Sequence, residues 1–127
     1  MPVIVTTISR RYHFESAHWL PNVPENHRCR NMHGHNYELE VTISGPVHDD
    51  GFVIDFWDID TIVQPIISKI DHMVLNNIEG LENPTAELIA AWFINKLNPR
   101  PIGNYFIPKV QLWETKDCSA VVKFMDF

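Results

Sequence analysis

Hydrophobic residues alternate with polar residues in the first part of the chain, as in β-strands that bury one face. From Ile4 to Phe14 the apolar residues fall mostly on even positions, with a break at Arg10. A second stretch alternates cleanly and places four apolar residues on one side: Tyr37, Leu39, Val41 and Ile43. A polar loop that contains prolines, residues 21–32, separates the two stretches. We therefore predict two strands joined by this loop, the second ending at Gly45-Pro46.

The next segment has helical periodicity. Asp55 is a typical N-cap residue, and Asp58 falls in the first turn, where a negative charge is favourable. Several apolar residues then follow at the spacing of one helix face: Phe56, Ile59, Ile62, Val63, Ile66, Ile67 and Ile70. Pro65 interrupts the pattern, so we expect it to kink or divide this helix.

A second helix is predicted to begin at Asn83-Pro84, because proline favours the first helical turn. Its expected buried stripe consists of Leu88, Ile89, Trp92, Phe93 and Leu97. Asn98-Pro99 should end this helix. Two final strands, about 109–115 and 120–127, are predicted on either side of a turn at 116–118.

The predicted order of elements is therefore ββααββ. Strand pairs at both ends of the chain and helices in the middle indicate an α+β fold, a four-stranded antiparallel sheet with two helices on one face. The edges of such a short sheet would be open, which favours association with other copies of the chain.

Length and composition narrow the class of protein. The 127 residues fit a single domain, 1–127. The formal net charge of −6 argues against a nucleic-acid partner, which a negative surface would repel. The longest apolar run, 88–94, is too short to cross a membrane, and the first residues lack the layout of a signal peptide. Since two cysteines make no disulfide framework, we expect a cytoplasmic protein.

Three histidines have the spacing of a metal site. His33 and His35 lie two residues apart, so they would point to the same side of a strand, the side that carries Tyr37. His18 would supply a third nitrogen from the neighbouring strand. Three protein ligands leave one position open, as in catalytic zinc sites. Zinc suits these nitrogen donors best, although iron and nickel are also compatible with them.

Cys29 lies four residues before His33, between Arg28 and Arg30. A thiolate beside a metal ion and two cations would be stabilised, which indicates a reactive thiol. Two alternatives remain open, a fourth zinc ligand that closes the site and a plain loop residue. The other cysteine, Cys118, lies in the predicted turn and has no expected role.

Further candidate residues lie later in the chain. Asp71 directly precedes His72, and a carboxylate close to an imidazole can hold it as an acid or base. Glu114 shares the strand parity of apolar neighbours, so its carboxylate could be buried and paired with N–H donors of a pterin or purine ring. The alternative is a salt bridge or an exposed strand end. Thr85 could contact a ligand, or simply start the second helix.

The sequence resembles the 6-pyruvoyl-tetrahydropterin synthase superfamily over almost its whole length. Five motifs occur in the family's order: Phe14-Glu-Ser-Ala-His18, Cys29-Arg-Asn-Met-His33-Gly-His35-Asn-Tyr37, Asp71-His72, Asn83-Pro-Thr-Ala-Glu87 and Trp113-Glu114-Thr115. The short interval between Cys29 and His33 is most similar to bacterial 6-carboxytetrahydropterin synthases. Trp19 departs from the basic residue expected at its position.

The resemblance implies a T-fold whose trimers form a twelve-stranded barrel, with two trimers stacked as a hexamer and active sites between subunits. It implies zinc bound by His18, His33 and His35, and Cys29 as the catalytic thiol. It also implies that Asp71 with His72 transfers protons.

The implied substrate is a pterin held by Glu114, with a contact from Thr85. The implied reaction converts dihydroneopterin triphosphate to 6-carboxytetrahydropterin, acetaldehyde and triphosphate, toward queuosine. The alternatives are a 6-pyruvoyl-tetrahydropterin synthase, a non-catalytic zinc- or pterin-binding T-fold protein, and a zinc hydrolase that does not need Cys29.

Overall fold

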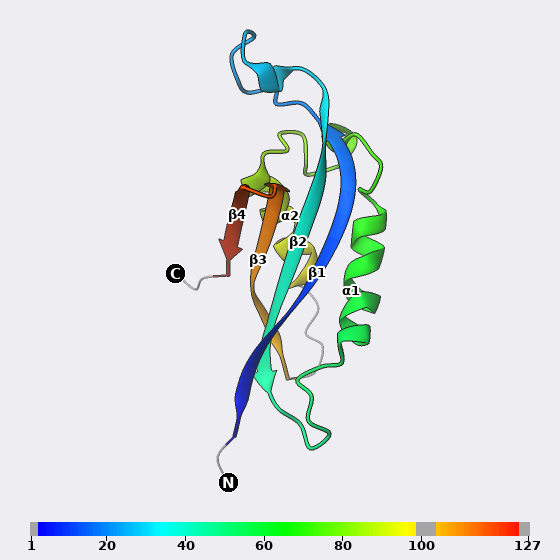
Figure 1. The fold of residues 1–127 in the computed structure, drawn as a ribbon, viewed down its shortest axis with the longest axis vertical. Helices are drawn as coiled ribbons and strands as arrows, with labels where there is room; N and C mark the ends of the chain where they lie inside the picture. The colour runs from blue at the N-terminus through cyan, green and yellow to red at the C-terminus, as the bar shows by residue number, and fades with distance from the viewer. Residues whose placement is uncertain (1–2, 99–103, 125–127) are drawn as a thin grey trace.

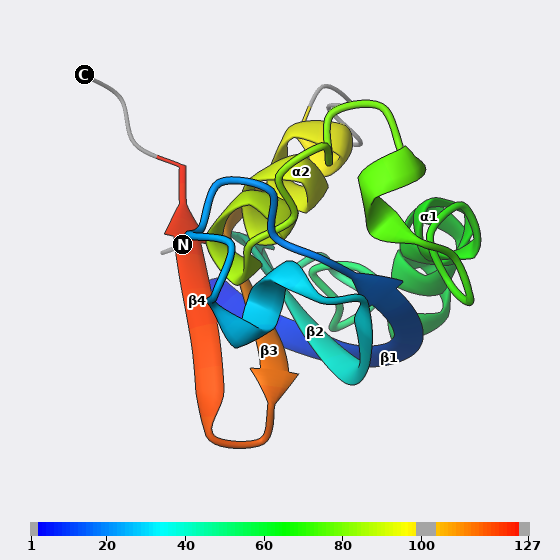
Figure 2. The same ribbon diagram turned by 90° about the horizontal axis from the view of Figure 1, so that it is seen from above.

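One antiparallel sheet of four strands, in the order β1-β2-β3-β4, carries two helices on the same face (Figure 1 and Figure 2). It is seen in a computed structural model that describes residues 3–98 and 104–124. The elements are β1 (Val5–His18), β2 (His33–Pro46), α1 (Phe56–Ser68), α2 (Ala86–Leu97), β3 (Phe106–Thr115) and β4 (Cys118–Lys123), with short 3₁₀ helices at Arg28–Arg30 and Leu75–Asn77. The predicted ββααββ order and α+β fold are confirmed.

The hydrophobic core fills the space between the sheet and the two helices. All the residues predicted to face inward on β2 are buried: Tyr37, Leu39, Val41 and Ile43. They belong to the same cluster as Ile59 and Val63 of α1 and Ile89 and Phe93 of α2. The pleat continues this inward side toward the start of β2, where His33 and His35 lie.

Pro65 does not divide the first helix, which was one of the two outcomes predicted for it. α1 runs from Phe56 to Ser68 without a division, and Asp55 caps it by accepting a hydrogen bond from the Trp57 amide, as predicted. Proline removes one helical hydrogen bond, which leaves the carbonyl of Thr61 without its partner. Because Pro65 and Thr61 are both exposed, water can satisfy that carbonyl.

The second helix begins later than predicted. Thr85 is the N-cap, and its hydroxyl accepts a hydrogen bond from the Leu88 amide, so Pro84 lies before the helix and not in its first turn. With this start, Leu88 lies on the outer side and is 45% exposed, so its place in the buried stripe was wrong. Phe56, at the first position of α1, is also exposed. The helix ends at Leu97 with Asn98 as its C-cap, and Pro99 lies outside the described residues.

The strands also differ in their bounds. β1 extends four residues beyond the predicted end at Phe14 and reaches His18. β4 begins at Cys118, which therefore belongs to the strand and not to the turn, and it ends at Lys123. Residues 125–127 of the predicted last strand lie outside the described part of the chain. The extension of β1 matters most, because it pairs His18 directly with His33 of β2.

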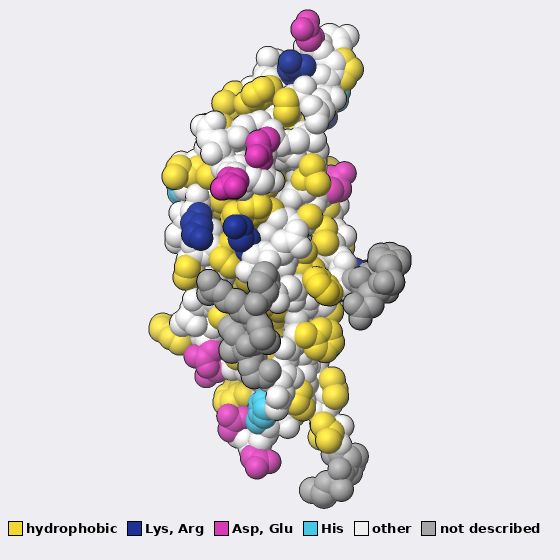
Figure 3. Space-filling model, turned by 180° about the vertical axis from the view of Figure 1, so that it is seen from behind, with side chains coloured by type: hydrophobic (Ala, Val, Ile, Leu, Met, Phe, Trp, Pro, Cys, Tyr) yellow, Lys and Arg dark blue, Asp and Glu magenta, His cyan; other side chains and the backbone are white. Residues whose placement is uncertain are grey.

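Both edges of the sheet lack a further strand in the described chain, although the segment from His72 to Val74 covers the β1 edge at Glu15 and Ala17. β1 pairs with β2 and otherwise forms one isolated bridge, Ala17 with Val74, while β4 pairs with β3. Exposed apolar side chains accompany these edges, among them Val5 on β1 and Val121 on β4, and Figure 3 shows such side chains on the side where β4 lies. Among the helices described here, none is long and apolar enough to cross a membrane.

A polar cluster ties β1 to α1. Arg10 donates two hydrogen bonds to the Asp60 carboxylate, at 3.1 and 3.2 Å, and the Tyr12 hydroxyl donates a third at 2.7 Å. These bonds, from Arg10 first and Tyr12 second, hold the pKa of Asp60 below its ordinary value of 3.8. The ionised form of Asp60 is therefore the one that stabilises the fold.

We expect Asp60→Asn to lower the free energy of unfolding by more at pH 7 than at pH 2.5. A carboxyl group with a lowered pKa contributes stability above its unfolded pKa and loses it as the pH falls through the folded value. Denaturant unfolding of both proteins at the two pH values measures the difference. Asp49→Asn, in an exposed turn, is the control. An equal effect of Asp60→Asn at both pH values would contradict the assignment.

Candidate active site

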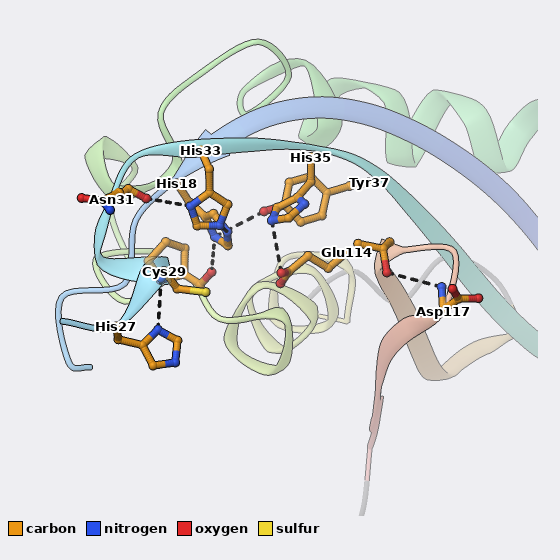
Figure 4. A network of polar contacts seen from close by, with 11 residues as sticks. His18, His27, Cys29, Asn31, His33, His35, Tyr37, Glu114 and Asp117 are labelled. Atoms are coloured by element: carbon orange, nitrogen blue, oxygen red, sulfur yellow. Dashed lines mark hydrogen bonds and ion pairs between the residues drawn. The ribbon is translucent and has the colours of Figure 1, made fainter. Parts of the chain in front are cut away.

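Three histidines meet where β1 ends and β2 begins (Figure 4). His18 pairs with His33 across the two strands, and His35 follows two residues later on the same side. One ring nitrogen from each histidine lies within 4.8 Å of the others, and together they form a group that could hold a metal ion. The spacing of His33 and His35 and the added nitrogen of His18 were predicted, and the structure brings all three together.

Hydrogen bonds to backbone carbonyls set the tautomers of two rings. His18 Nδ1 lies 2.8 Å from the Pro84 carbonyl oxygen, and His33 Nδ1 lies 2.7 Å from that of Asn31. Because a carbonyl only accepts, each Nδ1 carries a hydrogen that it donates. In a neutral ring, Nε2 then carries a lone pair and no hydrogen. These two Nε2 atoms face each other at 3.0 Å, so a cation between them would relieve their repulsion.

The third ring has a free nitrogen as well. His35 Nε2 is buried and has no hydrogen bond; Glu114 Oε1 lies 3.2 Å away, but outside hydrogen-bonding geometry. Burial lowers the pKa of both His18 and His35, with Glu114 opposing the shift. Neutral imidazoles with unused nitrogens are the form that binds metal. The residues thus fit a three-nitrogen metal centre with an open position.

Tyr37 lies beneath these rings and was not predicted as a site residue. It is fully buried, stacks on Phe14 with ring centres 4.9 Å apart, and places its hydroxyl 3.3 Å from His18 Nδ1. Burial, with a smaller contribution from Glu114, raises the pKa of Tyr37 far above its ordinary value, so the hydroxyl keeps its hydrogen. Its position two residues after His35, on the same side of the strand, was the signal available in the sequence.

Glu114 points to the histidine side of the sheet, as its parity predicted. Glu114 is the residue of a β-bulge. Trp113 pairs with Ser119 and Thr115 pairs with Cys118, so Glu114 between them has no partner in β4. Such a bulge re-aims a side chain at a sheet edge. The carboxylate is 26% exposed. A cavity of about 410 Å³ lies beside it, and its lining includes His35, Trp113 and Lys116.

Cys29 lies in the 3₁₀ helix Arg28–Arg30, within the loop that joins β1 to β2. Its amide donates a hydrogen bond of 3.0 Å to His27 Nδ1, and its side chain is partly exposed. Among the described residues, the metal-binding group contains the three histidines and not the Cys29 sulfur. This geometry therefore favours a separate thiol over a fourth ligand.

Asp71 and His72 follow α1 and lie along the free edge of β1. Asp71 Oδ1 accepts a hydrogen bond from the Glu15 amide at 3.0 Å and lies 2.9 Å from His72 Nδ1. The His72 amide donates to the Glu15 carbonyl at 2.6 Å. His72 has φ of 59°, a left-handed conformation that is strained for a side chain of this size and is often found at functional sites.

The structure does not join this pair to the metal-binding group within one chain. His72 Nε2 lies 3.6 Å from the Glu15 carboxylate, and Glu15 is an odd-numbered residue of β1 whose side chain points away from the face that carries Ser16 and His18. The side chain of His72 is 73% exposed. The predicted site residues therefore form two groups: both His35 and His72 line one cavity of about 460 Å³, but no hydrogen bond or ion pair among the described residues joins the pair to the three histidines.

Thr85, the remaining predicted site residue, lies at the start of α2. The Thr85 hydroxyl is engaged as the N-cap of α2, so its contact with a ligand stays a prediction. A larger cavity of about 670 Å³ lies near the start of α1, lined by His48, Asp58 and Tyr105 among others. No predicted site residue lines it, and the chemistry described above lies elsewhere.

The fold and the three-histidine group together define a T-fold protein with a candidate metal centre. The family model described as 6-pyruvoyl tetrahydropterin synthase matches residues 7–124. This chain belongs to that family.

Named relatives agree with this assignment. The 6-carboxy-5,6,7,8-tetrahydropterin synthase of Synechocystis sp. is 31% identical over 123 residues, covering 92% of this chain and 91% of the relative. The dihydroneopterin monophosphate aldolase of Pyrococcus furiosus is 34% identical over 83 residues, covering 65% and 70%. The solved structure of Caenorhabditis elegans 6-pyruvoyl tetrahydropterin synthase, 24% identical, superimposes with a TM-score of 0.86 over 98% of this chain and 99% of that one. The family supports a tetrahydropterin synthase activity of the lyase type.

Proposed function

We propose that the protein is a zinc-dependent 6-carboxytetrahydropterin synthase. It would convert dihydroneopterin triphosphate and one water molecule to 6-carboxytetrahydropterin, acetaldehyde and triphosphate, an early step toward queuosine and other 7-deazaguanines. The observation that carries the proposal is the three free imidazole nitrogens beside the Glu114 carboxylate. The short Cys29–His33 interval and the name of the Synechocystis relative favour the carboxy-forming reaction.

Zinc is the ion that this donor set suits best. Three neutral nitrogens match zinc sites that keep a fourth position for a reactant. A zinc ion bound there would supply Lewis-acid chemistry to oxygen atoms of the substrate. Glu114 would hold the pterin by accepting hydrogen bonds from its 2-amino and ring N–H groups, and Thr85 would contact the same ring.

Proton transfer would fall to Cys29, Asp71 and His72. The Cys29 thiolate would remove a proton from the side chain of the substrate, and the His72 imidazole would exchange another. Asp71 Oδ1, 2.9 Å from His72 Nδ1, would orient the ring so that Nε2 is the nitrogen that exchanges a proton with the substrate. No redox cofactor is required, because the ring gains the two electrons that the retained side-chain carbon loses as the C–C bond to the acetaldehyde fragment breaks.

The separation of the two residue groups supports an assembly of several chains. The open edges of β1 and β4 could pair between copies, and three copies would close the twelve-stranded barrel. Asp71 and His72, at the β1 edge, would then serve the metal centre of a neighbouring copy, and two trimers would stack as a hexamer. Two free cysteines fit a cytoplasmic location.

Product analysis tests the proposed function. Zinc-loaded protein is mixed with dihydroneopterin triphosphate, and the products are identified by mass spectrometry. Acetaldehyde with 6-carboxytetrahydropterin would support the proposal. Pyruvoyl-tetrahydropterin would assign the other branch of the family, and cleavage of dihydroneopterin monophosphate would assign the activity named for the Pyrococcus furiosus relative. Bound zinc without any product would indicate a binding protein.

Replacing Glu114 with glutamine should raise KM by about ten- to a hundredfold, with a smaller effect on kcat. A carboxylate accepts two N–H hydrogen bonds, whereas the amide offers one acceptor and turns an N–H group against a donor. Steady-state kinetics and pterin binding measure the effect. Glu82→Gln, at an exposed position in the loop before α2 and outside the cavity that Glu114 lines, is the control. An unchanged KM in Glu114→Gln would exclude the anchoring role.

A further inference from the structure

The imidazole of His27 is hydrogen-bonded to the backbone of Cys29. Its Nδ1 atom accepts the hydrogen of the Cys29 amide at 3.0 Å, a contact drawn in Figure 4, and the residue is the N-cap of the 3₁₀ helix Arg28–Arg30. An acceptor nitrogen carries no hydrogen, so the hydrogen of the neutral ring lies on Nε2. Helix caps are usually made by asparagine, aspartate or serine. The His27 ring takes the place of such a short polar side chain.

Both backbone polar groups of Cys29 are held by hydrogen bonds. The Cys29 carbonyl accepts a hydrogen bond from the Leu20 amide at 2.8 Å, and the Arg30 amide donates to the His27 carbonyl at 3.0 Å. These two contacts join backbone to backbone, so they do not depend on which side chains the residues carry. The contact of the Cys29 amide is different, because it needs an acceptor atom in the side chain at position 27.

The same short turn also contacts the metal-binding group. Asn31, the C-cap of the 3₁₀ helix, donates its amide hydrogen to the Arg28 carbonyl at 3.2 Å. The carbonyl oxygen of Asn31 lies 2.7 Å from His33 Nδ1. Cys29 and His33 are thus attached to one turn of backbone, so a change in its shape would move the thiol relative to the histidine ring. A misplacement of about 1 Å can lower the rate of a catalysed reaction by roughly a hundredfold.

We propose that His27 is a positioning residue for Cys29. By accepting the Cys29 amide hydrogen, the ring holds the turn in the shape that directs the sulfur to the side chain of the substrate. The inference rests on the proposed function for the role of the thiol, whereas the hydrogen bond itself is a property of this chain. His27 is exposed and lies outside the hydrophobic core, so an acceptor atom is what position 27 has to supply.

Two substitutions test whether this acceptor atom matters. His27→Ala removes it and should lower kcat for dihydroneopterin triphosphate by about ten- to a hundredfold. His27→Asn keeps an acceptor, because an asparagine oxygen can bond to the amide two residues later, and should restore kcat to within about threefold of the wild type. Asn26→Ala, at the exposed neighbouring position, is the matched control and should keep full activity. An unchanged kcat in His27→Ala, or an equal loss in both His27 variants, would overturn the proposal.

Metal content and thermal unfolding separate positioning from a purely structural role. His33 bonds to a backbone carbonyl, and the hydrophobic core lies elsewhere. His27→Ala should therefore keep about one zinc ion per chain and a Tm within about 3 °C of the wild type. A larger fall in Tm, or loss of the metal ion, would overturn the proposal and make His27 a support of the loop as a whole.

Alkylation of Cys29 by iodoacetamide gives a readout that needs no substrate. The reaction is followed in the Cys118→Ala background, so that Cys29 is the thiol that reacts. Cys29 is partly exposed, and release of the turn in His27→Ala should expose it further and speed alkylation by about three- to tenfold. His27→Asn, which keeps the acceptor, should react at the rate of the parent protein.

This readout keeps failure of the inference distinct from failure of the proposed function. If the wild type yields no product from dihydroneopterin triphosphate, the proposed function fails, and alkylation decides whether His27 holds Cys29 in place. Faster alkylation in His27→Ala that is reversed in His27→Asn would support the positioning of the thiol. Equal alkylation rates in the parent and both variants would overturn it.

Discussion

Replacing Cys29 with alanine should lower kcat by about two to four orders of magnitude while the protein keeps its metal ion and its fold. The three histidines hold the candidate metal centre without the Cys29 sulfur, so the substitution removes a proton acceptor and no ligand. The side chain lies in a partly exposed 3₁₀ helix outside the hydrophobic core, and its loss should cost little stability. Turnover of dihydroneopterin triphosphate and metal content per chain are the two measurements.

Cys118→Ala is the control for this variant. Cys118 is also a free cysteine, but it is exposed at the start of β4 and has no expected role. Full activity in Cys29→Ala would exclude the thiol as a base and favour hydrolysis by a metal-activated water. Loss of zinc together with activity would instead make Cys29 a ligand.

Replacing His33 with alanine should remove zinc binding at micromolar concentrations and abolish turnover. The variant keeps only His18 and His35, and two nitrogens do not make the three-ligand set of a catalytic zinc site. His33 is partly exposed, so its removal should leave the core intact. Metal content after dialysis, measured by mass spectrometry, should fall from about one ion per chain to near zero.

Thermal unfolding gives an independent readout of the same loss. Because a ligand that binds the native state stabilises it, a chelator should lower the Tm of the wild type and leave that of His33→Ala unchanged. His13→Ala, at an exposed position on the outer side of β1, should behave as the wild type does in both measurements. Retention of a full complement of zinc by His33→Ala would contradict the assigned ligand set.

Strand periodicity made the inner face of the sheet predictable. A strand alternates its side chains whatever surrounds it, so the parity of Tyr37 and Leu39 fixed the side on which His33 and His35 would lie. The helix boundaries were less certain, because proline is compatible with positions both just before and just inside a helix. Pro84 was placed inside, but the hydroxyl of Thr85 makes the cap.

Features that depend on the backbone of distant segments could not be predicted. The carbonyl of Pro84 fixes the tautomer of His18, yet no property of the proline side chain indicates this. The bulge at Glu114, unlike the side to which this residue points, arises from the pairing of β3 with β4. The position of Asp71 and His72 beside Glu15 depends on how the segment after α1 returns along the edge of β1.

The pairing of His18 with His33 determines which insertions and deletions the protein can tolerate. Because strand side chains alternate, loss or gain of a single residue within β1 would turn His18 to the outer face and Glu15 to the inner one. Changes in the length of the loop over 19–32 leave the strand register intact, and the same two rings still face each other. Among descendants of this chain, length variation should therefore accumulate in that loop and be absent from the two strands it connects.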